Sequence, residues 1–281
     1  GDIGVGAREV GYMFGQYKRI RNEWTGTLTG KGLSYGGSLA RTEATGFGLC
    51  YFTKEMLASK GESFEGKRVI ISGSGNVGTY ANKKTTQLGG KVVAQSDVSG
   101  YVYDENGIDY KIVEKIYQHR GLISEYLDYV PTAKFVEGPR NMWLDVKADV
   151  VLPCATQNEI DEEAAKAIVA NGAMALAEGA NMPCTPEAIK VYKEAGILYA
   201  PGKAANAGGV SVSGLEMSQN SERLSWTSEE VDNRLHMIME DIHQNCVKYG
   251  TEPDGYVNYV KGANIAGFMK VAKAIMAQGI V

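Results

Sequence analysis

The feature that most constrains the fold is residues 67–78, KRVIISGSGNVG. Its apolar run at 68–71 is typical of a buried central strand, and Gly73, Gly75 and Gly78 follow at G-x-G-x-x-G spacing. In such a segment the first glycine permits a tight turn, the second lets a pyrophosphate approach the backbone, and the third lets the next helix lie close to the strand. The segment therefore predicts a dinucleotide site in which phosphates meet the N-terminus of a helix.

Alternating strands and helices follow this segment. A helix is expected at 76–88 and a second strand at 91–94, and the alternation continues to residue 199. Further strands are expected at 133–136, 148–152, 173–177 and 197–199, and further helices at 109–119, 161–171 and 185–194. Strands separated by helices of this length pair in parallel through right-handed crossovers. The predicted fold class is α/β, with a Rossmann-type doubly wound parallel sheet.

The two ends of the chain are expected to be helical. Helices are predicted at 5–21, 42–59, 228–249 and 264–278. Segments 26–37 and 201–214 are dense in glycine and other small residues and are predicted to be loops. We expect the strand-rich middle to form one domain and both termini to pack together outside it.

Composition limits the classes of partner. The net charge of −4 over 281 residues, with both signs interspersed, argues against nucleic acid as the main partner. The sequence shows neither a long apolar run nor a basic-then-apolar leader, which argues against a membrane. The four cysteines form no C-x-x-C pair and three histidines are too few for a zinc site, so we expect a cytoplasmic protein without a bound metal.

The end of the second predicted strand bears on which coenzyme binds. Asp97 lies about twenty residues past the glycines, where a carboxylate accepts from the ribose 2′-hydroxyl of NAD. Ser96 and Ser74 offer hydroxyl donors near the same place, and such donors suit the 2′-phosphate of NADP, which a carboxylate would repel. We favour NADP on the hypothesis that Asp97 points aside, with NAD as the alternative.

Three later segments carry polar side chains toward the nicotinamide half. LPCATQNE at 152–159, with Ala155 and Thr156, and AEGANMP at 177–183, with Asn181, each follow a predicted strand. PGKAANAGGVSVSG at 201–214 supplies Asn206 and Ser213 as directional side chains and is expected to form the wall facing nicotinamide and substrate. Asn and Gly in these loops are also common turn formers, and that interpretation stays open. Asn181 is the best candidate for contacting the ribose or the carboxamide.

Without any family resemblance, two other segments predict only local structural roles for their charged residues. Asp2, bracketed by glycines, predicts the N-cap of the first helix. Arg41, within GGSLARTEATG at 36–46, predicts a helix start with a surface ion-pair partner.

An ordered set of segments resembles the hexameric bacterial glutamate dehydrogenases of the NADP type. It comprises GDIGVGAREVGYMFGQYKRI, GGSLARTEATG, SGSGNVG, LPCATQNE, AEGANMP, PGKAANAGGVSVSGLEMSQNSERLSW and residues 262–279, and it spans essentially the whole chain. The resemblance implies reversible oxidative deamination of L-glutamate to 2-oxoglutarate and ammonia, with hydride transfer to a nicotinamide coenzyme. It also implies a cytoplasmic homohexamer.

The same resemblance implies roles for individual residues. Asp2 matches the catalytic aspartate, a proton carrier beside a lysine. Arg41, Val210 and Ser213 match the substrate side, where the Ser213 hydroxyl helps hold the γ-carboxylate. The coenzyme contacts that it implies are Thr45, Asn76, Ser96 and Asn206. Together with the residues predicted above, the expected coenzyme contacts also include Gly73, Ser74, Gly75, Val77, Gly78, Asp97, Ala155, Thr156 and Asn181.

One departure from the family pattern changes the expectation for activity. The lysine-bearing P-x-G-G-G-K segment of the family is not among the 281 residues, so the chain resembles an enzyme lacking the N-terminal part of its substrate domain. We expect residues 1–37 and the helix at 258–281 to be remnants of that domain and 38–257 to be the dinucleotide-binding domain. Without the lysines, the chain should bind coenzyme but turn over glutamate only at background level.

Two other interpretations remain. Leucine and phenylalanine dehydrogenases share the general plan, although the Ser213 hydroxyl favours an acidic substrate side chain. A nucleotide-binding module without catalysis would also carry the glycine fingerprint. Such a module would not need Asp2, Arg41 and Ser213, so their presence favours an enzyme.

Overall fold

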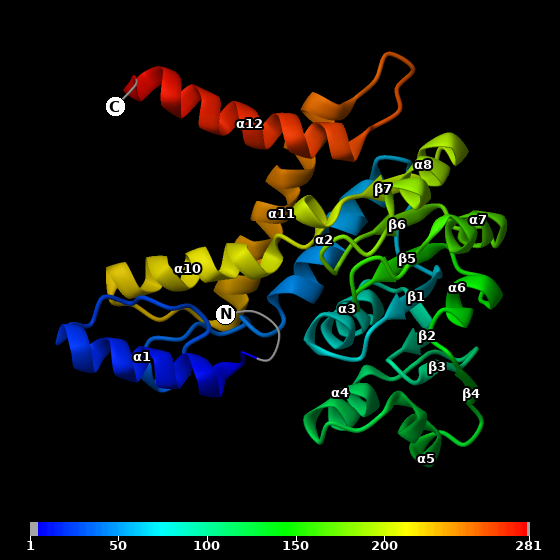
Figure 1. The fold of residues 1–281 in the computed structure, drawn as a ribbon, viewed down its shortest axis with the longest axis horizontal. Helices are drawn as coiled ribbons and strands as arrows, with labels where there is room; N and C mark the ends of the chain where they lie inside the picture. Colours follow the sequence, from blue (N-terminus) through cyan, green and yellow to red (C-terminus); the bar gives the residue numbers. More distant parts are fainter. Residues whose placement is uncertain (1–4, 280–281) are drawn as a thin grey trace.

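The strand that precedes the glycines lies at the centre of the sheet. The computed structural model describes residues 5–279, and within them seven strands form one sheet in the order β4-β3-β2-β1-β5-β6-β7. The strands are β1 (Arg68–Ser72), β2 (Lys91–Ser96), β3 (Gly100–Tyr103), β4 (Lys134–Glu137), β5 (Val150–Pro153), β6 (Ala175–Ala177) and β7 (Leu198–Ala200). β1 pairs in parallel with both β2 and β5, which confirms the doubly wound α/β class (Figure 1).

The strand β3 was missed in the sequence, and it makes the sheet mixed rather than purely parallel. It runs antiparallel to both β2 and β4. Only residues 97–99 join β2 to β3, and the Asp97 carboxylate accepts from the backbone N–H of Ser99 to close this turn at 2.7 Å. A connection this short permits only antiparallel pairing, because a parallel crossover needs a dozen residues or more.

Helices cover both faces of the sheet. One face carries α2 (Ala44–Ala58), α3 (Asn76–Gln87), α4 (Tyr110–Gln118) and α11 (Ser228–Gly250), and the other carries α6 (Asn141–Asp145), α7 (Glu162–Ala170) and α8 (Pro186–Ala195). Side chains of β1 alternate between two cores: Val69 and Ile71 belong to the first and Ile70 to the second. This alternation explains the unbroken apolar run, because both faces of a central parallel strand are buried.

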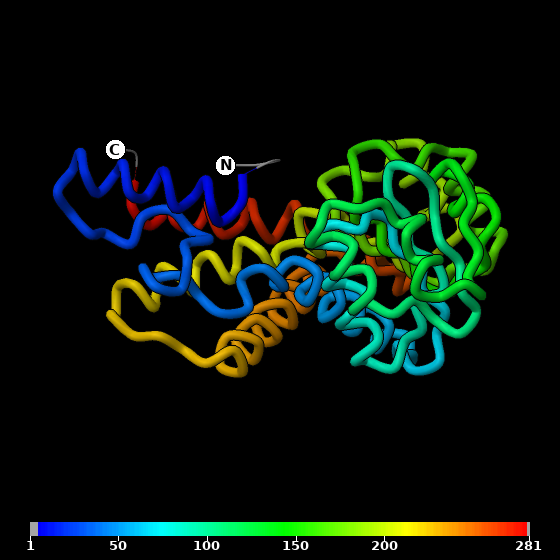
Figure 2. The backbone as a smooth tube through the Cα atoms, turned by 90° about the horizontal axis from the view of Figure 1, so that it is seen from below, coloured from blue at the N-terminus to red at the C-terminus, as the bar shows by residue number. Residues whose placement is uncertain are grey.

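The remaining long helices extend to one side of the sheet. They are α1 (Ala7–Arg21), α10 (Gly208–Glu222) and α12 (Tyr259–Gln278). α1 and α12 lie outside the sheet as expected, but they do not pack on each other in Figure 1, where α10 lies between them. Figure 2 shows the elongated outline that results, with the sheet domain at one end. Short helical turns complete the chain: η1 (Leu33–Tyr35), η2 (Ile123–Glu125), α5 (Tyr126–Tyr129) and α9 (Gly202–Ala205).

The prediction of a loop at 201–214 is wrong. The segment forms α9 and the first half of α10, and Gly208 and Gly209 lie against α2 rather than in solvent. Segment 26–37 is largely irregular, as predicted, apart from η1. Among residues 5–279, no helix combines the length and apolar character needed to cross a bilayer.

Candidate active site

The glycine turn has the geometry that a dinucleotide requires. Gly73 adopts φ of 83°, and a Cβ on Gly78 would lie 1.9 Å from the Gly73 carbonyl oxygen, so only glycine lets α3 start this close to β1. At Gly75, by contrast, the nearest atom to an added Cβ is Tyr117 Cε2 at 3.9 Å, which leaves open space above the backbone. Gly75 is the N-cap of α3 and offers no side-chain cap, so the first amides of the helix face this space. Those amides and the helix dipole fit a phosphate.

The carboxylate at the tip of β2 is bound by its own chain. Asp97 Oδ1 accepts from the backbone of Ser99, and Oδ2 accepts from the backbone N–H of Ile123 at 2.6 Å. Ser96 is only 1% exposed, whereas Ser74 is partly exposed beside the turn. Of the two predicted hydroxyl donors, Ser74 is therefore the accessible one in this structure.

The loops after β5 and β6 lie at the same edge of the sheet as the glycine turn. Ala155 and Thr156 are exposed there, as is Asn181. Asn181 Oδ1 accepts from Asn206 Nδ2 at 2.9 Å, so the structure brings these two predicted coenzyme contacts together. Asn206 is the C-cap of α9, a helical turn in a segment that was predicted to be a loop.

Glu159 ends the LPCATQNE segment, and the sequence assigned it no role. Its Oε1 accepts from Ser72 Oγ at 2.8 Å and from the backbone N–H groups of Ala155 and Thr156, each at 3.3 Å. Burial raises the pKa of the Glu159 carboxyl to about 7, and the three donors only partly offset that burial. A carboxyl group that titrates near neutrality therefore lies beside the glycine turn.

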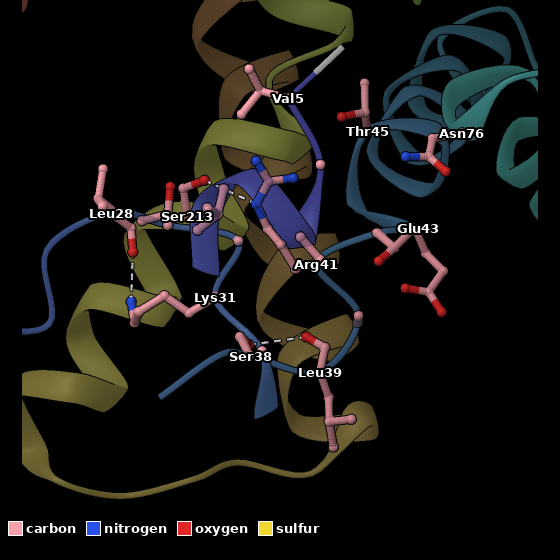
Figure 3. A pocket seen from close by; sticks show the side chains of 18 of the residues that line it. Val5, Leu28, Lys31, Ser38, Leu39, Arg41, Glu43, Thr45, Asn76 and Ser213 are labelled. Carbon is pink, nitrogen blue, oxygen red and sulfur yellow. Dashed lines mark hydrogen bonds between the residues drawn. The ribbon is translucent and has the colours of Figure 1, made fainter. Parts of the chain in front are cut away.

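A cavity of about 900 Å³ joins the helical region to the start of α3. It gathers six residues predicted for coenzyme or substrate: Arg41, Thr45, Asn76, Val77, Val210 and Ser213. Arg41 Nε donates to Ser213 Oγ at 3.0 Å, and Figure 3 shows this pair with Thr45 and Asn76 to one side of it. Asp2, predicted as the catalytic residue, lies outside the described residues.

Arg41 is not the surface residue that one interpretation allowed. Burial lowers the pKa of its guanidinium, and the nearby carboxylate of Glu216 opposes that shift. The cation therefore lies in a poorly solvated cavity, where an anionic ligand would interact with it more strongly than in water.

A buried ion pair fixes the wall of this cavity. The side chains of Lys31 and Glu216 are both 0% exposed, with Lys31 Nζ 2.8 Å from Glu216 Oε1. Lys31 Nζ also donates to the carbonyls of Gly26 and Leu28, while Glu216 accepts from the backbone N–H of Gly30 and of Lys31. Glu216 lies one helical turn after Ser213, so the pair holds loop 26–32 against the part of α10 that carries Ser213. Nothing in the local sequence distinguishes this Lys and Glu from surface charges.

One cluster of potential metal ligands also forms within the described chain. Glu55, His236 and Glu240 place ligand atoms within 4.8 Å of one another, although the sequence suggested no such grouping. The ammonium of Lys54 lies 3.2 Å from His236 Nε2 and 3.5 Å from a Glu55 oxygen. One cation of the chain therefore already lies against this cluster.

Comparisons with known proteins agree with the geometry. A family profile described as glutamate/leucine/phenylalanine/valine dehydrogenase matches residues 36–279. Similar curated proteins are the NAD(P)-specific glutamate dehydrogenase of Xylanibacter ruminicola, 63% identical, the NAD-specific enzyme of Bacteroides fragilis, 58% identical, and the NADP-specific enzyme of Haemophilus influenzae, 54% identical. Each match covers 100% of this chain and 63%, 64% and 63% of the respective relative, so the chain spans less than two thirds of their lengths.

A solved structure of Plasmodium falciparum glutamate dehydrogenase superposes with a TM-score of 0.95 at 45% identity. That match covers 100% of this chain and 61% of the other.

Proposed function

Because this chain belongs to the glutamate/leucine/phenylalanine/valine dehydrogenase family, we propose that it forms the coenzyme-binding part of a glutamate dehydrogenase. The reaction would be the reversible oxidative deamination of L-glutamate to 2-oxoglutarate and ammonia. The observation that carries this proposal is the Arg41–Ser213 pair, which shares a cavity with Thr45 and Asn76 at the start of α3. A carboxylate held by Arg41 and Ser213 would lie beside a coenzyme bound at that helix.

The proposed roles follow from where each side chain lies. Arg41 and the Ser213 hydroxyl would bind the substrate γ-carboxylate, with Val210 forming the wall beside them. Asn181 and Asn206, already hydrogen-bonded to each other, would orient the nicotinamide ribose and carboxamide together with Thr45. Asp2 would carry a proton during deamination. The bound nicotinamide would supply the hydride chemistry. The chain would hold the reactants in position and supply the electrostatic environment around them.

The remaining coenzyme contacts would come from the turn and from the neighbouring strand ends. The phosphates would lie over Gly75 and the first amides of α3, where no side chain intrudes. The proposed contacts are Gly73, Ser74, Gly75, Asn76, Val77, Gly78, Ala155 and Thr156. Ser96, which is buried, and Asp97, whose carboxylate is bound by its own chain, would shape the tip of β2 beside the adenosine ribose.

We further propose that NADP is preferred over NAD. The support is that both oxygens of the Asp97 carboxylate are bound by backbone donors of Ser99 and Ile123, so the carboxylate is turned toward its own chain. Ser74, partly exposed beside Gly75, then offers a hydroxyl to the 2′-phosphate. Named relatives of both coenzyme types are similar to this chain, so the preference needs a direct measurement.

The proposed organisation is residues 1–37 and 258–281 as parts of a substrate domain and 38–257 as the dinucleotide-binding domain. A homohexamer in the cytoplasm is the matching proposal for the whole enzyme. Four free, buried cysteines suit a reducing compartment.

Calorimetric titration of the 281-residue chain with NADPH and NADH tests the coenzyme proposal. NADPH should bind more tightly, and tighter binding of NADH would refute the preference. Binding of neither coenzyme would refute the function itself.

The substrate proposal needs a separate measurement. Ligand-observed NMR should detect 2-oxoglutarate on the coenzyme-bound chain, with the signal lost in Arg41→Met. A signal that persists in Arg41→Met would place the keto acid elsewhere.

The turnover of the chain tests a second candidate, a nucleotide-binding module without catalysis. The observation that favours it is that the 281 residues contain no P-x-G-G-G-K lysine segment. We expect coenzyme binding with glutamate oxidation at background level. Robust oxidation by the purified chain would refute this expectation.

A further inference from the structure

Glu159 lies at the point where the order of strands reverses. From β1 the chain builds outward through β2, β3 and β4, and it then returns to place β5 on the other side of β1. Ligands of open α/β sheets bind in the crevice at this switch point, beyond the carboxyl ends of the strands. Glu159 accepts from Ser72, the last residue of β1, and from Ala155 and Thr156 just after β5. It therefore ties together the two strand ends between which the coenzyme is expected.

The hydrogen bonds around Glu159 have a fixed direction. Ser72 Oγ accepts from the backbone N–H of Cys154 at 2.9 Å, so its own proton points to Glu159. All three donors converge on Oε1 of Glu159. A proton on Oε2 would leave each of these bonds intact, because a neutral carboxyl keeps its carbonyl oxygen as an acceptor.

No positive side chain compensates Glu159 within the described chain. The titratable groups facing it are two buried thiols, Cys154 on the β5 side and Cys184 on the β6 side, and the Glu159 carboxylate contributes to raising the pKa of both. Burial and the three hydrogen-bond donors account for the behaviour of Glu159 itself, whose pKa of about 7 leaves both charge states accessible near neutrality. A further negative charge or further loss of water would favour the neutral form.

We propose that Glu159 is a positioning residue of the dinucleotide site and takes up a proton when the coenzyme binds. This inference rests on the proposed function. The bound coenzyme brings the negative pyrophosphate to the switch point and displaces water from it, and both effects disfavour the charged carboxylate. The proton comes from solvent, and the neutral carboxyl continues to hold Ser72 and the loop after β5.

Coenzyme affinity should then depend on pH in a defined way. Above neutrality the dissociation constant should rise about tenfold per pH unit, until the carboxyl ionises in the complex as well. Glu159→Gln has the shape of the protonated carboxyl and retains an oxygen acceptor, so its affinity should be nearly flat with pH. Ser72→Ala removes a donor that favours the charged form and should move the onset of the loss to higher pH.

The test is calorimetric titration of the 281-residue chain with NADH near pH 7.5, in two buffers of different ionisation enthalpy. NADH is the primary probe because the 2′-phosphate of NADPH itself titrates near about pH 6. The wild-type chain should take up between half and one proton per NADH, and Glu159→Gln should take up almost none. Glu187→Gln, an exposed carboxylate on α8, is the matched control and should behave as wild type.

The outcomes separate this inference from the proposed function. Failure of NADH and NADPH to bind the wild-type chain overturns both. Binding without proton uptake, or uptake that persists in a folded Glu159→Gln variant, overturns the role of Glu159 and leaves the proposed function standing. If Glu159→Gln does not fold, Ser72→Ala decides: an unchanged pH profile overturns the proposal, and an upward shift supports it.

Discussion

Removing the ammonium of Lys31 should destabilise the substrate side of the protein sharply. In Lys31→Met, the Glu216 carboxylate stays buried and keeps only two backbone donors, Gly30 N–H at 2.9 Å and Lys31 N–H at 3.3 Å. The carbonyls of Gly26 and Leu28 lose the ammonium that now reaches them at 3.2 and 2.7 Å. Breaking a buried ion pair from one side typically costs about 3–5 kcal/mol, because it leaves a buried charge uncompensated. The two remaining donors and the nearby guanidinium of Arg41 place the expected cost near the lower limit, at about 3 kcal/mol.

Urea unfolding followed by circular dichroism measures the global cost, and hydrogen exchange measures the local one. The amides of Gly30 and Lys31 donate to Glu216, so their exchange should accelerate in Lys31→Met more than that of β1 amides. Two controls bracket the result. Removing both charges while keeping an acceptor for the two amides, as in Lys31→Met/Glu216→Gln, should recover most of the loss. Lys166→Met, which breaks an exposed pair with Glu162, should leave the urea midpoint almost unchanged.

A cost of less than about 1 kcal/mol for Lys31→Met, which is the range of an exposed pair, would refute the role of the buried charge. A double variant as unstable as the single one would refute it too, because the cost would then come from lost packing rather than from an unpaired charge.

Four further predictions concern the glycine turn, Glu159, Gly208 and Cys50. Gly75→Ala should fold normally yet lose dinucleotide affinity, whereas Gly78→Ala should be destabilised as well; calorimetry and thermal melts separate the two, and equal stability would contradict the 1.9 Å approach at Gly78. Glu159→Gln should gain up to about 3 kcal/mol over wild type at pH 8. Because the folded-state pKa is raised from 4.5 to about 7, the gain grows between those values and vanishes below pH 4.5, and a pH-independent difference in urea midpoints would refute it. Gly208→Ala should lower the melting temperature, because its Cβ would lie 2.1 Å from the Ala44 carbonyl oxygen; an unchanged melting temperature would contradict that packing. Cys50, whose thiol has a pKa raised to about 12 by burial, should resist thiol reagents until urea unfolds the chain, and rapid labelling of the native protein would disprove this.

Local patterns predicted the parts of the fold that local chemistry decides. The glycine turn and β1 were identified because strand, turn and helix start are adjacent in sequence. β3 was missed because its four residues, GYVY, have no helix between them and β2, and its pairing with β4 spans a connection of thirty residues. Strand pairing of that kind depends on partners that local periodicity does not show.

Side chains far apart in sequence make the candidate site, and only the structure joins them. The Arg41–Ser213 bond joins residues 172 positions apart, and the Lys31–Glu216 pair joins residues 185 apart. Arg41 and Ser213 could be named individually because the sequence resembles a known family. Lys31 and Glu216 could not be named from the sequence, because a lysine and a glutamate far apart in the chain look the same whether they form a buried ion pair or are both exposed.

The wrong prediction at 201–214 shows what the small residues of this protein accomplish. Glycine density there predicts a loop that approaches a ligand, but α10 crosses α2 backbone to backbone: a Cβ on Gly48 would lie 2.7 Å from Gly208 Cα. On another face of α2, a Cβ on Gly46 would lie 2.5 Å from Ala81 N and 2.7 Å from Val77 O in α3. One helix therefore packs against both the coenzyme helix and the helix of Ser213, with no room for a Cβ at these contacts. Figure 1 shows α2 between α3 and α10. Since neither contact leaves room for a side chain, α2 sets the distance between the dinucleotide turn and the substrate pocket. The glycines thus permit close, rigid helix packing between these two parts of the site.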